Sequence, residues 1–329
     1  MKPYIYITRK LPDEVLMPLQ KHYVVNMWEQ EEVPVPREIL LGEAEKADAL
    51  LTVLADTIDE GILTAGKNLK VVANLAVGFD NIDLKVANRQ GIAVCNTPDV
   101  LTDTTADLTF ALLMATARRI VEAAEFVKAG KWESWSPLLL AGQDIHHKTI
   151  GIVGMGKIGE TVAKRAKGFD MNILYHNRSR KPEIEQKLGA MYVSFAELVE
   201  KADFIVCLTP LTPDTKHMFT RDVFKKMKSS AIFINAGRGP VVDEEALYEA
   251  LVAEEIAGAG LDVFAKEPIS ADHPLLKLTN VVALPHIGSS SMETRVEMMR
   301  LCIDNIEVVL NRKEPKTLVN KEWKPVIKA

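Results

Sequence analysis

Three glycines, Gly154, Gly156 and Gly159, have the spacing Gly-x-Gly-x-x-Gly between an apolar run, 149–153, and a segment with helical periodicity. In a strand-turn-helix unit, the first glycine permits a tight turn, the second lets the backbone approach a pyrophosphate, and the third lets helix and strand pack closely. Backbone N–H groups at the helix N-terminus then bind the phosphates. The motif therefore predicts a dinucleotide site. The residues assigned to it are Gly154, Met155, Gly156, Lys157, Ile158 and Gly159.

The next apolar run, 171–175, completes a β-α-β unit and is followed by a basic turn rather than by an acidic residue. An acidic residue at this place usually binds the ribose 2′-hydroxyl of NAD. Two guanidinium groups beside a hydroxyl suit a 2′-phosphate instead, although a solvated basic turn is the alternative. The turn thus favours NADP(H), with NAD(H) as the alternative cofactor. The residues assigned to the 2′-phosphate are Asn177, Arg178, Ser179 and Arg180.

Length and composition limit the class of protein. A chain of 329 residues with 47% apolar residues predicts two domains with buried cores. A net charge of −5 without a basic stripe argues against nucleic-acid binding. We see no leader peptide and no run of eighteen apolar residues, so we expect no membrane partner and a cytoplasmic location. The distant cysteines Cys95, Cys207 and Cys302 indicate neither a disulfide framework nor a zinc site, and catalysis should need no metal.

The pattern of apolar runs predicts an α/β protein made of two doubly wound parallel sheets. In the first hundred residues, short runs at 4–8, 49–54, 71–76 and 93–96 alternate with helical stretches. One long helix is predicted over 102–128, bridging the domains and ending at Gly130. After the glycine turn, further apolar runs occur at 191–193, 204–208, 231–235, 258–262 and 281–283, and six strands should form this doubly wound second sheet. The last helix, 292–311, should return to the first domain. The predicted domains are 1–100 with 289–329, and 101–288.

Several further motifs occur in one order along nearly the whole chain, at 74–80, 104–107, 154–159, 235–239, 260–264, 267–268 and 285–288. With them the chain resembles the D-isomer-specific 2-hydroxyacid dehydrogenase family, and within it the glyoxylate and hydroxypyruvate reductases and the related 2-ketogluconate reductases. The resemblance implies two Rossmann-like or flavodoxin-like domains with an active-site cleft between them. The smaller, discontinuous domain would bind substrate, and the other would bind the nicotinamide cofactor.

The resemblance assigns Arg238, Glu267 and His286 as the catalytic residues. The planar fork of arginine suits the carboxylate and carbonyl oxygen of a 2-oxo acid and polarises the carbonyl. Histidine, with an ordinary pKa of about 6.5, can give a proton to the nascent alkoxide near neutral pH. A neighbouring glutamate would orient the imidazole and favour its protonated form. Taken singly, each of the three is more often an ordinary loop residue, but all three follow predicted strands, where open α/β sheets bind ligands.

The same resemblance assigns further residues to ligands. The backbone N–H groups of Val77 and Gly78 would bind the substrate carboxylate, and Asp262 would accept a hydrogen bond from the nicotinamide amide. The remaining cofactor residues are Thr105, Thr209, Pro210, Ala236, Gly237 and Gly288. The remaining substrate contacts are Leu54 and Trp135, together with Arg238 and His286. For Val77 and Gly78 the alternative is a simple strand-ending turn, and for Asp262 a strand cap.

Trp132 and Trp135 resemble a two-tryptophan segment through which one subunit of these reductases reaches toward its partner's site, which implies a homodimer. For Trp135, an interface or core anchor is an equal alternative. The predicted activity is NADPH-dependent reduction of glyoxylate or hydroxypyruvate to the D-2-hydroxy acid. 2-Ketogluconate reduction is the nearest alternative, and a hydroxyphenylpyruvate substrate is also conceivable. A protein of another class, an NAD(P)-sensing corepressor that acts through partners, and formate or phosphite oxidation are less favoured.

Overall fold

The computed structural model describes residues 2–324, which form two compact units. Unit 1 contains the described residues up to Leu101 and those from Ser291 onward, and unit 2 is Thr102–Ser290. The sequence predicts these boundaries one and two residues earlier, after residues 100 and 288. Each unit has its own sheet and its own core.

Unit 1 contains a five-stranded parallel sheet in the order β2-β1-β3-β4-β5, which is the flavodoxin-like order. The strands are β1 (Tyr4–Ile7), β2 (Val24–Met27), β3 (Ala49–Thr52), β4 (Val71–Asn74) and β5 (Ala93–Cys95). The three strands from β3 to β5 are buried throughout, as parallel strands covered on both faces must be. The sequence does not predict β2, because this edge strand is half exposed and lacks an apolar run.

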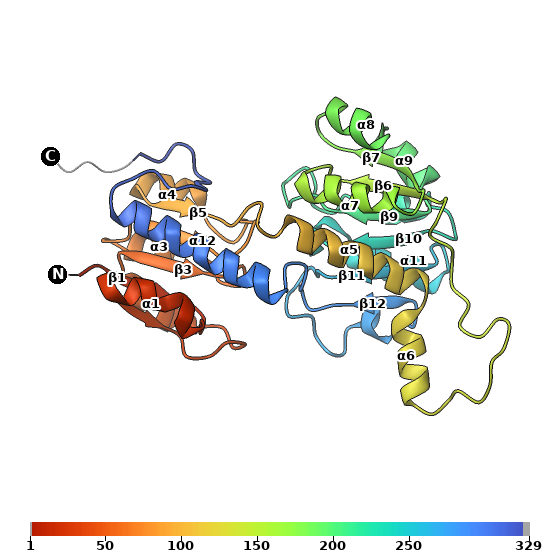
Figure 1. The fold of residues 1–329 in the computed structure, drawn as a ribbon, viewed down its shortest axis with the longest axis horizontal. Helices are drawn as coiled ribbons and strands as arrows, with labels where there is room; N and C mark the ends of the chain where they lie inside the picture. The colour runs from red at the N-terminus through yellow and green to blue at the C-terminus, as the bar shows by residue number, and fades with distance from the viewer. Residues whose placement is uncertain (1, 325–329) are drawn as a thin grey trace. The chain divides into compact units, whose positions relative to one another are not determined.

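Helices cover both faces of this sheet (Figure 1). They are α1 (Asp13–His22), α2 (Arg37–Ala44), α3 (Glu60–Ala65), α4 (Leu84–Gln90) and α12 (Met292–Leu310). Side chains of α2, α3 and α4 share one apolar cluster with alternate residues of the strands. The C-terminal helix α12 is capped by Ser291, whose side chain accepts the Thr294 N–H, and the helix packs on β3, β4 and β5. The prediction that this helix returns to the first domain is confirmed.

Unit 2 contains a seven-stranded parallel sheet in the order β12-β11-β10-β9-β6-β7-β8. The strands are β6 (Thr149–Val153), β7 (Asn172–His176), β8 (Met191–Tyr192), β9 (Phe204–Cys207), β10 (Ile232–Asn235), β11 (Gly258–Leu261) and β12 (Val281–Ala283). The predicted number of six strands is one too low, but the predicted run at 191–193 does form a strand, the two-residue edge strand β8, which pairs with β7. From β6 the chain adds β7 and β8 on one side of the sheet and then β9 to β12 on the other, so the strand order reverses between the neighbouring parallel strands β6 and β9.

Two apolar clusters lie on the two faces of this sheet. One contains side chains of α5 (Thr102–Ala117), α7 (Lys157–Lys167) and α8 (Pro182–Leu188). The other contains side chains of α9 (Phe195–Lys201), α10 (Arg221–Phe224) and α11 (Glu244–Val252). Successive strand residues alternate between the clusters: Ile232 and Ile234 belong to the first, and Phe233 to the second. The sheet is therefore doubly wound, as predicted.

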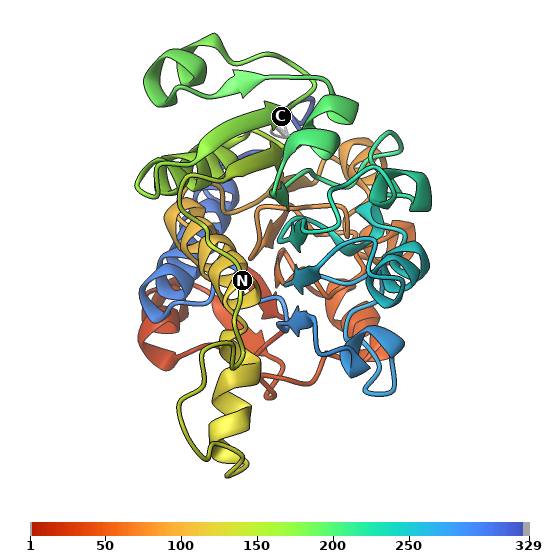
Figure 2. The same ribbon diagram turned by 90° about the vertical axis from the view of Figure 1, so that its right-hand side faces the viewer.

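The predicted single helix over 102–128 is wrong. It is interrupted at Arg119, which has a left-handed φ of 54°, so that α5 is followed by a separate helix, α6 (Ile120–Lys128). Helix α6 has no buried residue, although it carries Ile120, Val121 and Val127. Figures 1 and 2 show α6 and the loop after it extending away from the body of unit 2. Within residues 2–324, no helix is both long and apolar enough to cross a bilayer.

Candidate active site

The glycine turn lies at the point where the strand order reverses, which is where open α/β sheets bind ligands. Gly154 follows β6 with a φ of +105°, and a Cβ atom on it would lie 2.8 Å from the carbonyl carbon of Leu208, after β9. A Cβ atom on Gly237, after β10, would lie 2.9 Å from the oxygen of Thr209. The segments that follow three neighbouring strands are therefore in backbone contact, and this contact requires glycine.

The other two glycines of the turn have different surroundings. A Cβ atom on Gly159 would lie 2.3 Å from the oxygen of Gly154, so Gly159 permits close packing of α7 on the turn. A Cβ atom on Gly156, the N-cap of α7, would meet nothing within 4 Å. The helix N-terminus is thus open to a ligand at Gly156, which fits the phosphates of a dinucleotide. The side chain of Met155 is fully buried, so only its backbone is available for such contacts.

The two arginines of the basic turn after β7 differ in their contacts. Arg180 donates from Nε and Nη2 to the two carboxylate oxygens of Glu185 in α8, at 2.8 and 2.7 Å. Arg180 and the hydroxyl of Tyr175 lower the pKa of Glu185 to about 2. Arg178 is exposed and has no hydrogen bond or ion pair with any residue in 2–324. Of the two guanidinium groups, Arg178 is therefore the one available to a phosphate.

The predicted catalytic residues follow β10, β11 and β12, three neighbouring strands of unit 2. The turn after β10 is fixed by Asn235, whose amide donates to the Arg238 carbonyl and accepts the Gly237 N–H, both at 3.1 Å. Gly239 packs directly on the backbone of Phe264, where a Cβ atom would overlap the carbonyl carbon. This close approach brings the segment that carries Arg238 against the segment that leads to Glu267.

His286 and Glu267 are in direct contact. His286 Nδ1 lies 2.7 Å from Glu267 Oε2, and Glu267 Oε1 accepts the Phe264 N–H at 3.0 Å. Burial raises the pKa of Glu267, but the hydrogen bond and charge of His286, the Phe264 N–H and the charge of Arg238 outweigh it and leave that pKa below its ordinary value. Both side chains remain partly exposed. The pair can therefore hold a proton next to a ligand, as a general acid requires.

The backbone at His286 has a left-handed φ of 55°, which is rare for a residue other than glycine. The buried carboxylate of Asp262 accepts the N–H of the next residue, Ile287, at 2.8 Å. Burial raises the pKa of Asp262, although the Ile287 N–H opposes this effect. A Cβ atom on Gly288 would lie 3.2 Å from Asp262 Oδ2 and 3.3 Å from a methyl group of Thr105. Three predicted cofactor residues thus pack around the turn that presents His286.

The predicted substrate residues Val77 and Gly78 lie in unit 1, in the loop after β4. Their carbonyls accept hydrogen bonds from the Asn96 and Asn74 amides, at 2.8 and 2.9 Å. Their N–H groups donate to no described residue, so the turn presents two free donors. The motif 74–80 includes Asn74, but the sequence does not predict the anchoring role of this asparagine. Leu54, also in unit 1, is half-buried in the loop after β3.

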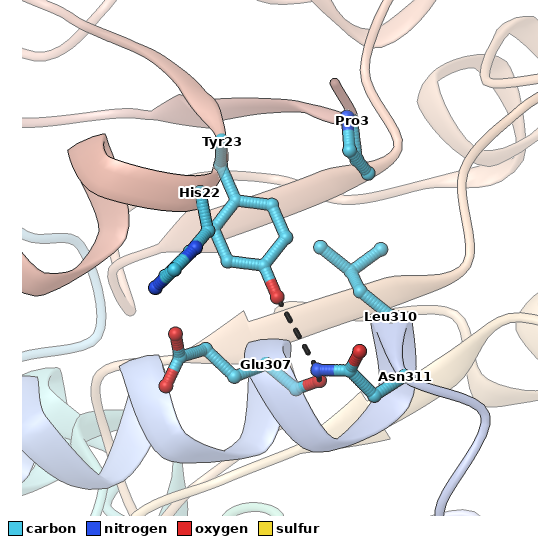
Figure 3. A pocket seen from close by; sticks show the side chains of 6 residues that line it. All are labelled: Pro3, His22, Tyr23, Glu307, Leu310 and Asn311. Atoms are coloured by element: carbon cyan, nitrogen blue, oxygen red, sulfur yellow. Dashed lines mark hydrogen bonds between the residues drawn. The ribbon is translucent and has the colours of Figure 1, made fainter. Parts of the chain in front are cut away.

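One surface hollow of unit 1 contains none of the predicted site residues (Figure 3). It lies where the C-terminal ends of α1 and α12 meet, and Asn311 there donates to the Tyr23 hydroxyl at 3.4 Å. Among the described residues, no group of three or more His, Cys, Asp or Glu side chains is arranged to hold a metal ion.

Residues 110–288 match the family model described as "D-isomer specific 2-hydroxyacid dehydrogenase, NAD binding domain". The chain is 48% identical over 326 residues to the glyoxylate reductase of Thermococcus onnurineus, covering 98% of this chain and 97% of the relative. The chain belongs to the D-isomer-specific 2-hydroxyacid dehydrogenase family. The identity to the glyoxylate reductase of Korarchaeum cryptofilum is 46% over 323 residues, covering 98% and 97% of the two chains. This dehydrogenase is therefore an oxidoreductase of the glyoxylate reductase branch, and the predicted resemblance is confirmed.

Solved structures agree with this assignment of the dehydrogenase fold. A protein from Thermus thermophilus superposes with a TM-score of 0.90 at 42% identity, covering 96% of this chain and 99% of that one. An NADPH-dependent glyoxylate/hydroxypyruvate reductase of Sinorhizobium meliloti, in complex with NADP and malonate, superposes with a TM-score of 0.87 at 31% identity, covering both chains fully. The predicted fold class, with a Rossmann-type NAD-binding domain, is confirmed.

Proposed function

We propose that this dehydrogenase reduces glyoxylate and related small 2-oxo acids, such as hydroxypyruvate, to D-2-hydroxy acids with NADPH. The observation that carries the proposal is the contact between His286 and Glu267, in a unit whose glycine turn leaves a helix N-terminus open. The relatives named glyoxylate reductase, which match over almost the whole chain, support glyoxylate as a substrate.

Bound at the open turn, the nicotinamide cofactor supplies the hydride. Arg238 binds the carboxylate and carbonyl oxygen of the acid and stabilises the charge that develops on that oxygen. His286 donates the proton to the oxygen, and Glu267 orients the ring through Nδ1, which leaves Nε2 to face the substrate. The free N–H groups of Val77 and Gly78 bind the substrate carboxylate. Asp262, as a proposed cofactor contact, accepts from the nicotinamide amide and holds the His286 turn.

The preference for NADPH rests on Arg178 and on the missing acidic residue after β7. Arg178 is exposed and unpaired among the described residues, whereas an NAD-specific site would offer a carboxylate there. The 2′-phosphate carries negative charge and several acceptor oxygens, which a guanidinium binds more strongly than a ribose hydroxyl. Asn177 and Ser179 border the same turn, and their mutual contact, from the Asn177 amide to the Ser179 carbonyl, shapes it.

A substrate series tests the proposal. Oxidation of NADPH and of NADH is followed with glyoxylate, hydroxypyruvate, 2-ketogluconate and pyruvate, and kcat/KM is compared for each pair. We expect the highest kcat/KM for glyoxylate or hydroxypyruvate with NADPH. A dominant rate with 2-ketogluconate would identify a different substrate. Tight NADPH binding with no turnover on any of the four acids would contradict an enzymatic role on small 2-oxo acids and favour a cofactor-sensing protein.

We also propose that the enzyme is a homodimer whose interface includes α6 and the segment after it. Trp135 is 79% exposed and lies in the segment after α6, and α6 and this segment, which carry further exposed apolar residues, extend from the body of unit 2 (Figure 2). These exposed residues are Ile120, Val121, Val127, Trp132, Trp135, Leu138 and Leu139. Exposed apolar residues concentrated in one segment are typical of a protein interface, and a second copy of this chain would cover them.

The three cysteines bear on the location of the enzyme. Cys95, Cys207 and Cys302 are free thiols buried in the two units, and burial raises the pKa of Cys95 to about 12 and that of Cys207 to about 11. They behave as small apolar side chains rather than as nucleophiles or disulfide partners. Free thiols are typical of a reducing compartment, so we place the enzyme in the cytoplasm.

A further inference from the structure

The loop between β11 and Glu267 is held by two carboxylates at consecutive backbone N–H groups. Glu267 Oε1 accepts the Phe264 N–H at 3.0 Å, and Glu244 Oε1 accepts the Ala265 N–H at 2.6 Å. Glu244 is the first residue of α11, in which Asp243 is the N-cap. Its side chain is mostly buried, with 17% of its surface exposed. A short hydrogen bond that a mostly buried carboxylate accepts is a strong restraint on the backbone N–H that donates it.

The same carboxylate connects the loop of Glu267 to the segment of Arg238. From Arg238 the chain passes through Gly239, which packs on Phe264 and leaves no space for a Cβ atom, and then through a 3-10 turn into α11. Glu244 returns from the start of that helix to Ala265. The two segments are thus fixed to one another at two adjacent places, one by close packing and one by a charged hydrogen bond.

We propose that Glu244 is a positioning residue for catalysis: by holding Ala265, it fixes Phe264 and thereby the carboxylate of Glu267 against His286. If Ala265 moves, the Phe264 N–H moves with it, and Glu267 loses the contact that fixes its other oxygen. The inference rests on the proposed roles of Glu267 and His286. Glu244 has a second neighbour, His273, whose Nε2 lies 3.7 Å from Glu244 Oε2. The other ring nitrogen of His273, Nδ1, accepts the Leu275 N–H. His273 therefore presents Nε2 to Glu244.

Two substitutions of Glu244 distinguish the effect of its side-chain length from the effect of its charge. Glu244→Asp keeps the charge at the start of α11 but shortens the side chain, so that it no longer reaches Ala265. Glu244→Gln loses the charge but keeps an oxygen that can accept the N–H. We expect Glu244→Asp to lower kcat about ten- to a hundredfold, as small misplacements of catalytic groups do, with an unchanged KM for NADPH. Glu244→Gln should retain most of the activity. Glu245→Asp, next in the chain and exposed, is the matched control and should match the wild type.

The pH profile distinguishes positioning from a general loss of structure. The charged groups that act on Glu267 are His286, Arg238 and Asp262. A displaced Glu267 stabilises the protonated imidazole of His286 less well. The alkaline limb of the pH profile of the reduction rate should therefore move to lower pH in Glu244→Asp. A loss of equal size at every pH, or a Glu244→Gln enzyme as slow as Glu244→Asp, would overturn the proposal.

A measurement that does not depend on turnover tests the role of Glu244 independently of the proposed substrate. In protein with isotope-labelled histidine, the NMR signal of His286, assigned with His286→Ala, should titrate at lower pH in Glu244→Asp than in the wild type or Glu245→Asp. An unchanged titration in folded Glu244→Asp would contradict the positioning role, whatever acid the enzyme reduces. Wild-type protein that is inactive on all four acids would instead contradict the proposed function.

Discussion

Glu267 and His286 are nineteen residues apart in the chain, yet Oε2 of one and Nδ1 of the other are 2.7 Å apart. The two residues follow the neighbouring strands β11 and β12, whose parallel pairing brings their carboxyl ends to one edge of the sheet. The contact fixes which ring nitrogen of His286 remains available to a ligand. The proposed proton transfer therefore depends on this single contact.

Replacing His286 by alanine removes the proposed proton donor. We expect kcat for 2-oxo acid reduction to fall by a factor of about a hundred to ten thousand, the usual contribution of general acid catalysis. The affinity for NADPH, measured by fluorescence titration, should stay within about twofold, since the glycine turn is elsewhere in unit 2. Turnover at the wild-type rate would remove His286 from the mechanism.

Glu267 makes stability depend on pH. Its pKa in the folded protein lies below the ordinary value of 4.5 because the His286 contact, the Phe264 N–H and the charge of Arg238 outweigh burial. A lowered pKa stabilises the fold above the unfolded value, and this contribution is lost as the pH falls through the folded value. Urea unfolding of the wild type and Glu267→Gln from pH 7 to pH 3 should show a difference in unfolding free energy that disappears toward the acid end. A difference that grew on acidification would contradict this assignment.

The glycine turn offers a matched pair of substitutions. Gly159→Ala puts a Cβ atom 2.3 Å from the Gly154 oxygen, so it should destabilise the fold by about 1–3 kcal/mol, the usual cost of overpacking. Gly156→Ala meets no protein atom within 4 Å, so it should keep the stability and weaken NADPH binding. Thermal unfolding and cofactor titration of both variants measure this. A Gly156→Ala protein that binds NADPH normally would show that the cofactor does not approach this backbone.

The two arginines of the basic turn should contribute unequally. Arg178→Ala should weaken NADPH about ten- to a hundredfold and leave NADH nearly unchanged, because hydrogen bonds to a charged group contribute about 1.5–3 kcal/mol. Arg180→Ala should have a smaller effect, since that guanidinium is already paired with Glu185. KM values for both cofactors in both variants decide this. Equal losses for NADPH and NADH in Arg178→Ala would contradict the assignment to the 2′-phosphate.

The proposed dimer depends on the exposed apolar residues around Trp135. Trp135→Ser combined with Leu138→Ser should shift the protein from dimer to monomer in sedimentation-velocity experiments. Val24→Ser, an exposed apolar residue of unit 1, serves as the control and should not change the mass. A wild-type protein that sediments as a monomer at micromolar concentration would contradict the homodimer.

The sequence by itself determines the strand-turn-helix unit at Gly154–Gly159, the order of the α/β elements and the residue types of the site. These features are local: glycine spacing and apolar periodicity act within one β-α-β unit. The interruption of the helix at Arg119 and the edge strand β2 are not predicted, since a left-handed residue or a half-exposed strand leaves no periodic signal. Only the tertiary structure decides which residues meet. It pairs Arg180 with Glu185, leaves Arg178 available, and brings Glu244 to Ala265, because strand pairing and helix packing join residues that are distant in the chain.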